Sequence, residues 1–223
     1  MKYYLPSEFE LVVLDESNIF DFIDLEFYKD KIILLKDKLF GYYDYIKALV
    51  LYCNGGLFLD VDTIVTEKFV VPLSFLKSTN LVAYSDGVGN ICCGYLLANK
   101  HSFVLEELIR RYQMEYYLLK NKLQAQRLRN FIFNDVIRYF DKSEVLLLDA
   151  EKEGYLVEKA LFGVSSRYLY RDFYFSNKYS LDDFFSRSSG VSALRNSVTP
   201  REFKLMNEKD FLKQDILLAK LFV

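Results

Sequence analysis

Short apolar runs, separated by stretches of mixed apolar and charged residues, recur along this chain. Continuous apolar runs of this kind are typical of strands that are covered on both faces of a sheet. The pattern predicts such strands at residues 9–14, 32–35, 81–84, 92–98 and 145–148. Stretches with helical periodicity predict helices near residues 18–29, 41–53, 101–121 and 124–140. Because strands alternate with helices, we expect an α/β protein with a central, mostly parallel sheet and flanking helices.

The helix predicted over residues 41–53 has two different faces. Its apolar stripe is formed by Tyr42, Ile46, Leu49 and Cys53. Asp44 and Lys47 share the other face, because residues three apart are neighbours on a helix surface. An ordinary ion pair is one interpretation of these two residues, and a role in ligand binding is the other.

A Gly-Gly turn, Gly55-Gly56, connects this helix to a predicted buried strand that ends in two carboxylates, Asp60 and Asp62. Residues two apart on a strand point to the same side, so the two carboxylates are predicted to leave the core side by side. Charges at the end of a buried strand need a partner, and a hard divalent cation such as Mn²⁺ or Mg²⁺ suits oxygen ligands. A cation held by so few carboxylates keeps open positions for substrate phosphates. The residues therefore predict a metal–diphosphate site at the carboxyl end of a strand.

The spacing around these acids resembles that of the DXD-motif sugar-transferase superfamily, which includes the bacterial capsular polysaccharide synthesis glycosyltransferases and the yeast outer-chain mannosyltransferases. The family pattern is Ser-Asp, two residues, Arg, three residues, Leu-Tyr, two residues, Gly-Gly, three residues and Asp-x-Asp. At the same spacings this chain has Tyr43-Asp44, Lys47, Leu51-Tyr52, Gly55-Gly56 and Asp60-Val61-Asp62. The resemblance covers about residues 5–105.

The resemblance implies a GT-A-like nucleotide-sugar-binding fold without the usual first strand. It implies metal-dependent transfer of a sugar, with retention of configuration, from a nucleotide-diphosphate sugar to a polysaccharide or glycolipid acceptor. Asp60 and Asp62 would bind the metal, with Asp62 the stronger ligand candidate, and Asp44 and Lys47 would lie near the donor. Lys47 replaces the family's Arg, which keeps the positive charge but loses the planar fork that recognises phosphates.

Further candidates for substrate binding lie in turns and on a helix. Gly55 and Gly56 allow a tight turn with positive φ, and contact with the donor is left open. Loops after strands often carry binding groups, so the loop containing Asp86 and Asn90 is a candidate, with a plain Asp-Gly turn as the alternative. Two polar residues interrupt an aromatic-rich helix and could face the acceptor, with a solvated helix face as the alternative; they are Asn134 and Asp135. The single histidine, His101, is interpreted as structural.

Composition narrows the partners and the compartment. The chain has 223 residues and a net charge of −2, which gives no reason to expect nucleic acid as a partner. Its three cysteines lack metal-ligand spacing, and this favours a reducing compartment. The apolar runs are too short to span a bilayer, and no signal peptide is recognised at the start. We therefore expect a cytoplasmic protein, with peripheral attachment to the inner face of the membrane left open.

The chain is predicted to form a single glycosyltransferase-like domain over residues 1–223, with its core at about 5–150. Residues 151–223 would then be an acceptor-side or docking segment. Within it, residues 209–223 have helical length and a broad apolar surface, which fits a helix docked on the core or an interface for a partner or membrane. The basic residues between 110 and 130 fit a solvated helix face or a surface for an anionic acceptor or lipid headgroups.

Several family elements have no counterpart in this chain. Relatives begin with an extra strand that helps hold the nucleotide, and they carry late His and Ser-Trp elements, whereas this chain has no Trp. These departures leave a second hypothesis from another class, a non-catalytic binding or scaffold subunit of a polysaccharide assembly complex. A metal phosphohydrolase is less favoured because no further cluster of acids and histidines accompanies the paired acids.

Overall fold

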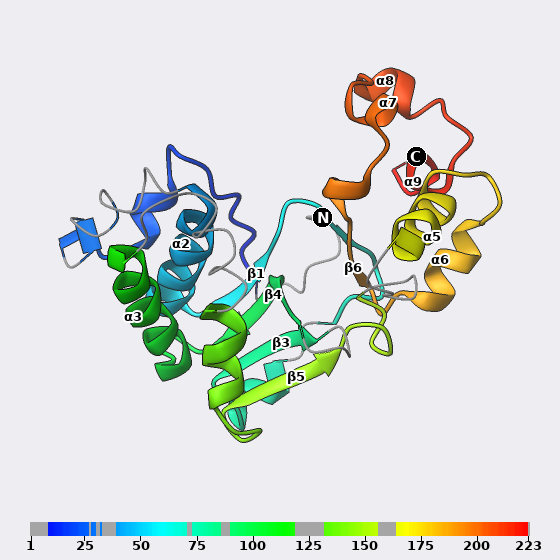
Figure 1. The fold of residues 1–223 in the computed structure, drawn as a ribbon. Coiled ribbons are helices and arrows are strands. Elements are labelled where there is room, and N and C mark those ends of the chain that lie inside the picture. The colour runs from blue at the N-terminus through cyan, green and yellow to red at the C-terminus, as the bar shows by residue number, and fades with distance from the viewer. Residues whose placement is uncertain are drawn as a thin grey trace. The chain divides into compact units, whose positions relative to one another are not determined.

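The computed structural model describes residues 9–26, 28, 29, 32, 39–70, 73–85, 90–118, 132–155 and 164–222. The chain forms two compact units, which are described separately below (Figure 1). The unit that we call the sheet unit comprises Ser7–Leu59 and Val71–Leu148. The other, the C-terminal unit, comprises Met1–Pro6, Asp60–Val70 and Asp149–Val223. The boundary between Leu59 and Asp60 lies directly before the paired acids.

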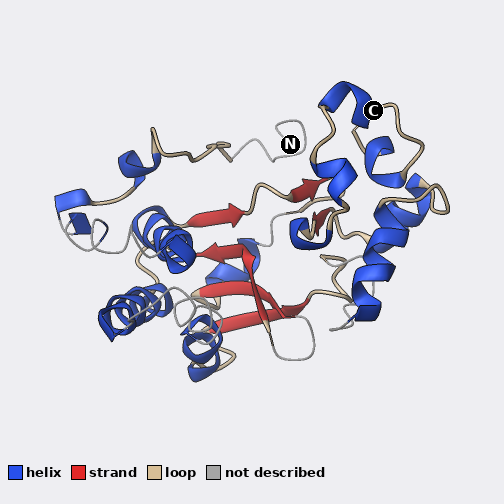
Figure 2. Ribbon diagram, turned by 45° about the horizontal axis from the view of Figure 1, so that its top comes forward, coloured by secondary structure: helices blue, strands red, loops and turns tan. Residues whose placement is uncertain are grey.

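The sheet has four strands in the order β1 (Gly56–Leu59), β4 (Ile91–Ala98), β3 (Leu81–Ser85) and β5 (Val145–Asp149) (Figure 2). β4 runs antiparallel to both neighbours, pairing Gly56 with Ala98 on one side and Leu81 with Ala98 on the other. The predicted α/β character is confirmed, and the strands predicted near 81–84, 92–98 and 145–148 are present. The expectation of a mostly parallel sheet is corrected at β4. The connection from β3 to β4 is too short for the crossover that parallel neighbours require.

Two long helices of the sheet unit pack against each other, α2 (Leu39–Asn54) and α3 (Phe103–Leu118). The Tyr45 and Tyr112 rings meet edge to face at 6.4 Å, and Gln113 donates a hydrogen bond to the Tyr45 hydroxyl at 2.8 Å. α2 confirms the helix predicted over 41–53, and α3 confirms most of the next predicted helix. Of the helix predicted over 124–140, residues 132–139 are helical and the earlier residues lie outside the described ranges.

The core of the sheet unit joins these helices to the inner strands. Its fully buried members include Leu49, Leu81, Ala83, Ala98, Val104, Leu105 and Tyr112. Residues 132–139 add a further apolar face through Ile132, Phe133, Val136 and Ile137. The apolar stripe predicted for α2 is therefore partly confirmed, because Ile46 and Leu49 are buried while Tyr42 and Cys53 are half-buried.

The N-terminal prediction is wrong in part. Residues 9–14 form no strand, and the Val13 side chain is 69% exposed. A strand needs a ladder partner as well as apolar residues, and here the chain enters a local turn in which Asp15 Oδ1 accepts from the Ser17 N–H at 2.7 Å. A 3₁₀ helix, η2 (Ile19–Phe22), and helical residues at 25, 26, 28 and 29 follow. Of the strand predicted at 32–35, Ile32 is helical and buried, and 33–35 lie outside the described residues.

The C-terminal unit contains a two-stranded sheet and an aromatic core. β2 (Thr63–Val65) pairs antiparallel with β6 (Val191–Ala193). The helices are α5 (Val164–Tyr174), α6 (Leu181–Arg187), η4 (Asn196–Val198), α7 (Arg201–Lys204), α8 (Glu208–Phe211) and α9 (Leu217–Lys220). Their shared core contains Ile64, Tyr170, Phe173, Tyr174, Phe184, Leu217 and Leu218. The sheet unit also contains η3 (Leu73–Lys77).

The last apolar segment is docked rather than continuous. Residues 209–223 do not form one helix; α8 ends at Phe211 and α9 begins at Leu217. Leu217, Leu218 and Ala219 are buried, and the Leu217 N–H donates to the Ser176 carbonyl at 3.1 Å. This supports the docked interpretation for α9. Across the described residues, none of the helices combines the length and apolar character that crossing a bilayer requires.

Candidate functional site

The paired acids lie in the turn between β1 and β2. β1 ends at Leu59, and the Thr63 N–H donates to the Asp60 carbonyl at 3.1 Å. Asp60 and Asp62 are half-buried, whereas Val61 between them is 95% exposed. The prediction that both acids belong to the strand is therefore corrected. Val61 is thus far more exposed than its two acidic neighbours.

A distant strand fixes the backbone of this turn. The Leu194 N–H, directly after β6, donates to the Asp62 carbonyl at 2.7 Å, and Thr63 pairs with Ala193 in the ladder. The next residue is Arg195, whose N–H donates to the Tyr170 hydroxyl at 2.9 Å. The register thus places a segment with a cationic residue beside the acids. This pairing is not predictable from local sequence, because two three-residue strands far apart in the chain leave only a weak periodic signal.

Thr63 adds a feature that the sequence reasoning missed. Its side chain is 6% exposed, and among the described residues its hydroxyl has no hydrogen-bond partner. Leaving a buried hydroxyl unsatisfied costs about 1–3 kcal/mol. This hydroxyl belongs to the residue that directly follows Asp62 in the chain.

The donor chemistry here fits a hard cation in an open site. Asp60 and Asp62 supply carboxylate oxygens, and one or two carboxylates are a common protein contribution to a Mg²⁺-type site that also binds phosphates. In the described ranges, no group of three or more His, Cys, Asp or Glu side chains is arranged to hold a metal ion. The pair therefore suits a cation shared with a ligand better than a closed, all-protein metal site.

Asp44 and Lys47 lie on α2 in a more buried setting than predicted. The Lys47 Nζ is 3.6 Å from Asp44 Oδ1, and the side chains are 12% and 5% exposed. The ammonium group also lies 5.4 Å from the centre of the Phe58 ring on β1. The ion pair named as the structural alternative is present. Contact of either residue with a donor stays a prediction.

The two glycines form the predicted turn with positive φ. Gly55 has a φ of 70° and donates its N–H to the Leu51 carbonyl at 2.7 Å, which closes the carboxyl end of α2 in the usual left-handed manner. A Cβ at Gly55 would lie 2.7 Å from the Lys100 backbone nitrogen. Gly56 has a φ of 98°, but a Cβ there would meet nothing within 4 Å. The structure thus explains Gly55 by a close backbone approach.

The remaining candidates are brought together only in part. The Ile91 N–H donates to Asn134 Oδ1 at 2.9 Å, so this side chain anchors the start of β4, next to Asn90. Asn90 and Asp135 are exposed, and the solvated alternative for Asp135 fits this placement. Asp86 lies outside the described residues. His101 occupies a turn with a φ of 57°, which agrees with its structural interpretation.

No family model, curated protein or solved structure matches this chain in comparison with known proteins. The resemblance to the DXD-motif sugar transferases therefore stays a prediction, carried by the spacing of its motif residues.

Proposed function

We propose that this chain is a metal-dependent glycosyltransferase that moves a sugar from a nucleotide-diphosphate sugar to a polysaccharide or glycolipid acceptor, with retention of configuration. The observation that carries the proposal is the motif register as it is folded. A helix closed by Gly55 leads into β1, and Asp60 and Asp62 follow in a turn that is tied to β6. A cytoplasmic location, with peripheral attachment to the membrane as an alternative, is part of the proposal, and so is the GT-A-like fold.

Asp60 and Asp62 are proposed to hold Mn²⁺ or Mg²⁺, which when bound supplies positive charge against the departing diphosphate. The protein's own contribution is positional. The Leu194 N–H holds the Asp62 carbonyl, and the β2–β6 ladder holds the residue that follows. Thr63 contributes a buried hydroxyl for which the described part of the chain provides no hydrogen-bond partner. These backbone hydrogen bonds restrict the main chain of the turn that carries the two carboxylates, and such preorganisation favours electrostatic catalysis.

Lys47 is proposed, on its place in the motif register, to supply positive charge to the donor phosphates. Asp44 holds its ammonium group, and the Phe58 ring lies beneath it. A lysine bound in this way acts as a fixed point charge, without the bidentate geometry of arginine. Donor binding weaker than an arginine would give is the expected consequence.

A nucleotide-release assay tests the proposal. Common UDP- and GDP-sugars are incubated with the protein and Mn²⁺ without acceptor, because slow hydrolysis of the donor reports on diphosphate departure. We expect release of nucleoside diphosphate from one donor, with EDTA, Asp60→Asn and Asp62→Asn each reducing the rate at least 100-fold, of the order found for loss of one strong electrostatic contact. The matched control is Asp182→Asn, an exposed acid at the start of α6 in the C-terminal unit, which should retain the wild-type rate.

The second candidate is a non-catalytic subunit of a polysaccharide assembly complex. The observation that favours it is the absence of a strand over residues 9–15, the part of the described chain that precedes the helices. In this case no nucleotide sugar would release nucleoside diphosphate, and Mn²⁺ with UDP or GDP would leave the melting temperature unchanged. Release that persists in Asp60→Asn would contradict the assignment of the paired acids in either case.

A further inference from the structure

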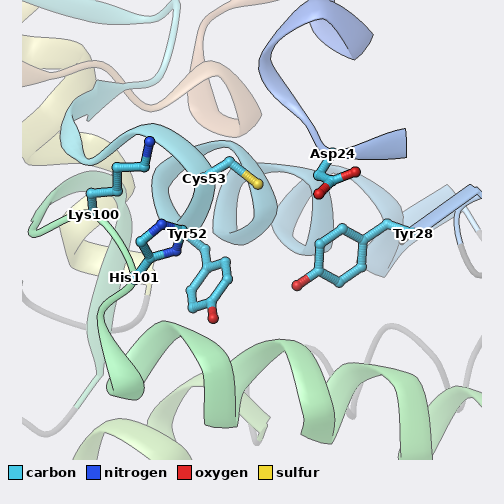
Figure 3. Close-up of a pocket in the computed structure, with 6 residues that line it drawn as sticks. All are labelled: Asp24, Tyr28, Tyr52, Cys53, Lys100 and His101. Carbon is cyan, nitrogen blue, oxygen red and sulfur yellow. The ribbon is translucent and has the colours of Figure 1, made fainter. Parts of the chain in front are cut away.

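A pocket of about 360 Å³ lies at the carboxyl end of α2, and all its described lining residues belong to the sheet unit (Figure 3). Its described lining residues are Asp24, Tyr28, Tyr52, Cys53, Lys100 and His101. Figure 3 shows that they come from three segments: the one that precedes α2, the last turn of α2 itself, and the turn that leads into α3. The volume falls at the lower end of the range of about 300–1,000 Å³ that small-molecule sites occupy.

The backbone holds one wall of this pocket in place. The His101 N–H donates to the Tyr52 carbonyl at 2.8 Å, and the two rings meet edge to face at 5.2 Å. His101 adopts a φ of 57°, a conformation that residues other than glycine rarely take without a structural or functional reason. The close approach of Gly55 to Lys100 fixes the same turn from the other side. The wall formed by Lys100 and His101 is therefore already formed before any ligand arrives.

The polar groups of the pocket are mixed donors and acceptors. Burial, and then the nearby Tyr52 and Cys53, raise the pKa of Tyr28 to about 12. Burial also raises the pKa of Tyr52. Both tyrosines therefore keep their hydroxyl protons at neutral pH and can donate as well as accept. Asp24 supplies a carboxylate acceptor and Lys100 an ammonium donor, and neither makes a hydrogen bond or ion pair within the described part of the chain.

This lining disfavours two kinds of ligand. Asp, Cys and His side chains are typical zinc ligands, but the described residues hold no group of three such side chains placed for a metal. A nucleoside diphosphate is also disfavoured, because the negative charge of Asp24 balances the positive charge of Lys100 and leaves nothing for a polyanion. A small, uncharged ligand with many hydroxyl groups satisfies the donors, the acceptor and the aromatic rings together.

We propose that this pocket is a carbohydrate-binding site for a neutral saccharide unit, with Asp24 and Lys100 binding its hydroxyl groups and the Tyr28 and Tyr52 rings covering its apolar faces. The site is separate from the paired acids. Gly55 and Gly56 connect the pocket end of α2 to the start of β1, whereas Asp60 follows the end of that strand. At about 3.3 Å per residue, the strand alone separates its two ends by roughly 10 Å. The inference needs no catalytic activity and stands apart from the proposed transfer.

Saccharide binding is measured directly on the full chain. Saturation-transfer NMR is recorded with glucose, galactose, mannose, N-acetylglucosamine, lactose and maltose, without metal or nucleotide. We expect saturation transfer to at least one of them. Because the Cys53 thiol lines the pocket, the same sugar should slow alkylation of Cys53 by iodoacetamide, which peptide mass spectrometry follows separately from Cys92 and Cys93.

Matched variants locate the binding. Asp24→Asn and Tyr52→Phe should each weaken the sugar about tenfold, as expected for loss of one hydrogen bond to a charged or buried group. The controls are Asp21→Asn, an exposed acid in the same segment, and Tyr139→Phe, whose ring is 84% exposed; both should bind as the wild type does. Asp62→Asn should also retain sugar binding, so a failure of the transferase proposal leaves this result unaffected.

Three results would overturn the inference. The first is no saturation transfer to any of the six sugars. The second is sugar binding that Asp24→Asn and Tyr52→Phe leave unchanged while both variants keep the wild-type melting temperature. The third is protection of Cys53 by a zwitterion such as glycine or lysine with none by a sugar, which would assign the Asp24 and Lys100 charges to an amino-acid ligand.

Discussion

The start and the end of β1 hold their polar groups by different physical means. At the start, Gly55 closes α2 and lets the backbone of Lys100 approach, so neighbouring turns of one compact unit define the pocket. At the end, Asp62 is held by the N–H of Leu194, which comes from a segment far along the chain. The first arrangement depends on local backbone conformation, and the second on a long-range ladder. A substitution that disrupts one should therefore leave the other largely intact.

The largest effect is expected from Gly190→Ala, at the ladder that holds the paired acids. Gly190 has a φ of 108°, and a Cβ there would lie 2.2 Å from the Phe69 backbone nitrogen. The Gly190 carbonyl also accepts from the Thr66 N–H at 2.7 Å, so a shift would disturb the chain just after β2. Steric clash and backbone strain together should cost about 4 kcal/mol of unfolding free energy.

Urea denaturation followed by fluorescence measures this loss of stability. The nucleotide-release assay then reports on the paired acids after β1, and the sugar-binding assay reports on the pocket before β1. We expect Gly190→Ala to reduce nucleotide release while Cys53 stays protected by sugar. Loss of sugar protection in a variant that is still folded would show that the two ends of β1 are not independent.

Gly55→Ala is the corresponding change at the start of β1. A Cβ would meet the Lys100 nitrogen at 2.7 Å while the residue holds a φ of 70°, so we expect a loss of about 3 kcal/mol. Gly56→Ala is the matched control, because its φ is also positive but its Cβ would meet nothing within 4 Å. The control should lose only about 1 kcal/mol, from backbone strain alone. Equal losses in the two variants, measured by urea denaturation, would exclude the close approach to Lys100 as the cause.

The two ends of β1 also differ in how well they could be predicted from sequence. At the start, the period of α2 and the Gly-Gly pair are local signals, and the helix, its left-handed closure and the following strand agree with them. At the end, the apolar residues before Asp60 and the two-residue spacing of the acids predict a strand that includes both Asp60 and Asp62. The structure instead places them in a turn, since the Thr63 N–H returns to the Asp60 carbonyl.

Two further features could not be predicted from local sequence patterns. The β2–β6 pairing and the pocket each join segments far apart in the chain, and periodicity within a window carries no information about such contacts. At residues 9–14 the local pattern predicts an element that the structure does not contain. Their apolar residues suggested a buried strand, yet Val13 is exposed, because burial depends on a partner that the local pattern does not specify.

Lys47→Ala tests the strand between the two ends, since Lys47 lies over Phe58 of β1. Removing the ammonium takes one ionic contact away from the buried Asp44 carboxylate. Breaking a fully buried pair typically costs about 3–5 kcal/mol, and we expect about 2 kcal/mol here, because the charges are 3.6 Å apart and Lys47 retains some exposure. Lys47→Arg should keep most of this stability and maintain or raise donor affinity.

Lys178→Ala, which breaks an exposed pair with Asp172, is the control and should cost less than 1 kcal/mol by urea denaturation. Donor affinity is measured by calorimetry with the same proteins. Unchanged affinity in Lys47→Ala would place this residue away from the donor phosphates, and its role would then be confined to stability.

The smallest effect concerns the ionisation of Tyr28 in the pocket. Its pKa is raised to about 12, mainly by burial, from an ordinary value of 10. Between these values the unfolded chain has lost the phenol proton while the folded chain retains it, so stability contributed by the neutral phenol is complete below pH 10 and is lost as the pH rises toward 12. Because the Tyr28 side chain is only half-buried, water screens part of this effect, and we expect only about 1 kcal/mol from this residue. The measurement is the difference between the wild type and Tyr28→Phe in urea denaturation at pH 9 to 11.5, so that contributions from the rest of the chain cancel. The wild type should lose more stability than the variant over this interval, and identical slopes would mean that the Tyr28 hydroxyl is as well solvated in the folded chain as in the unfolded one.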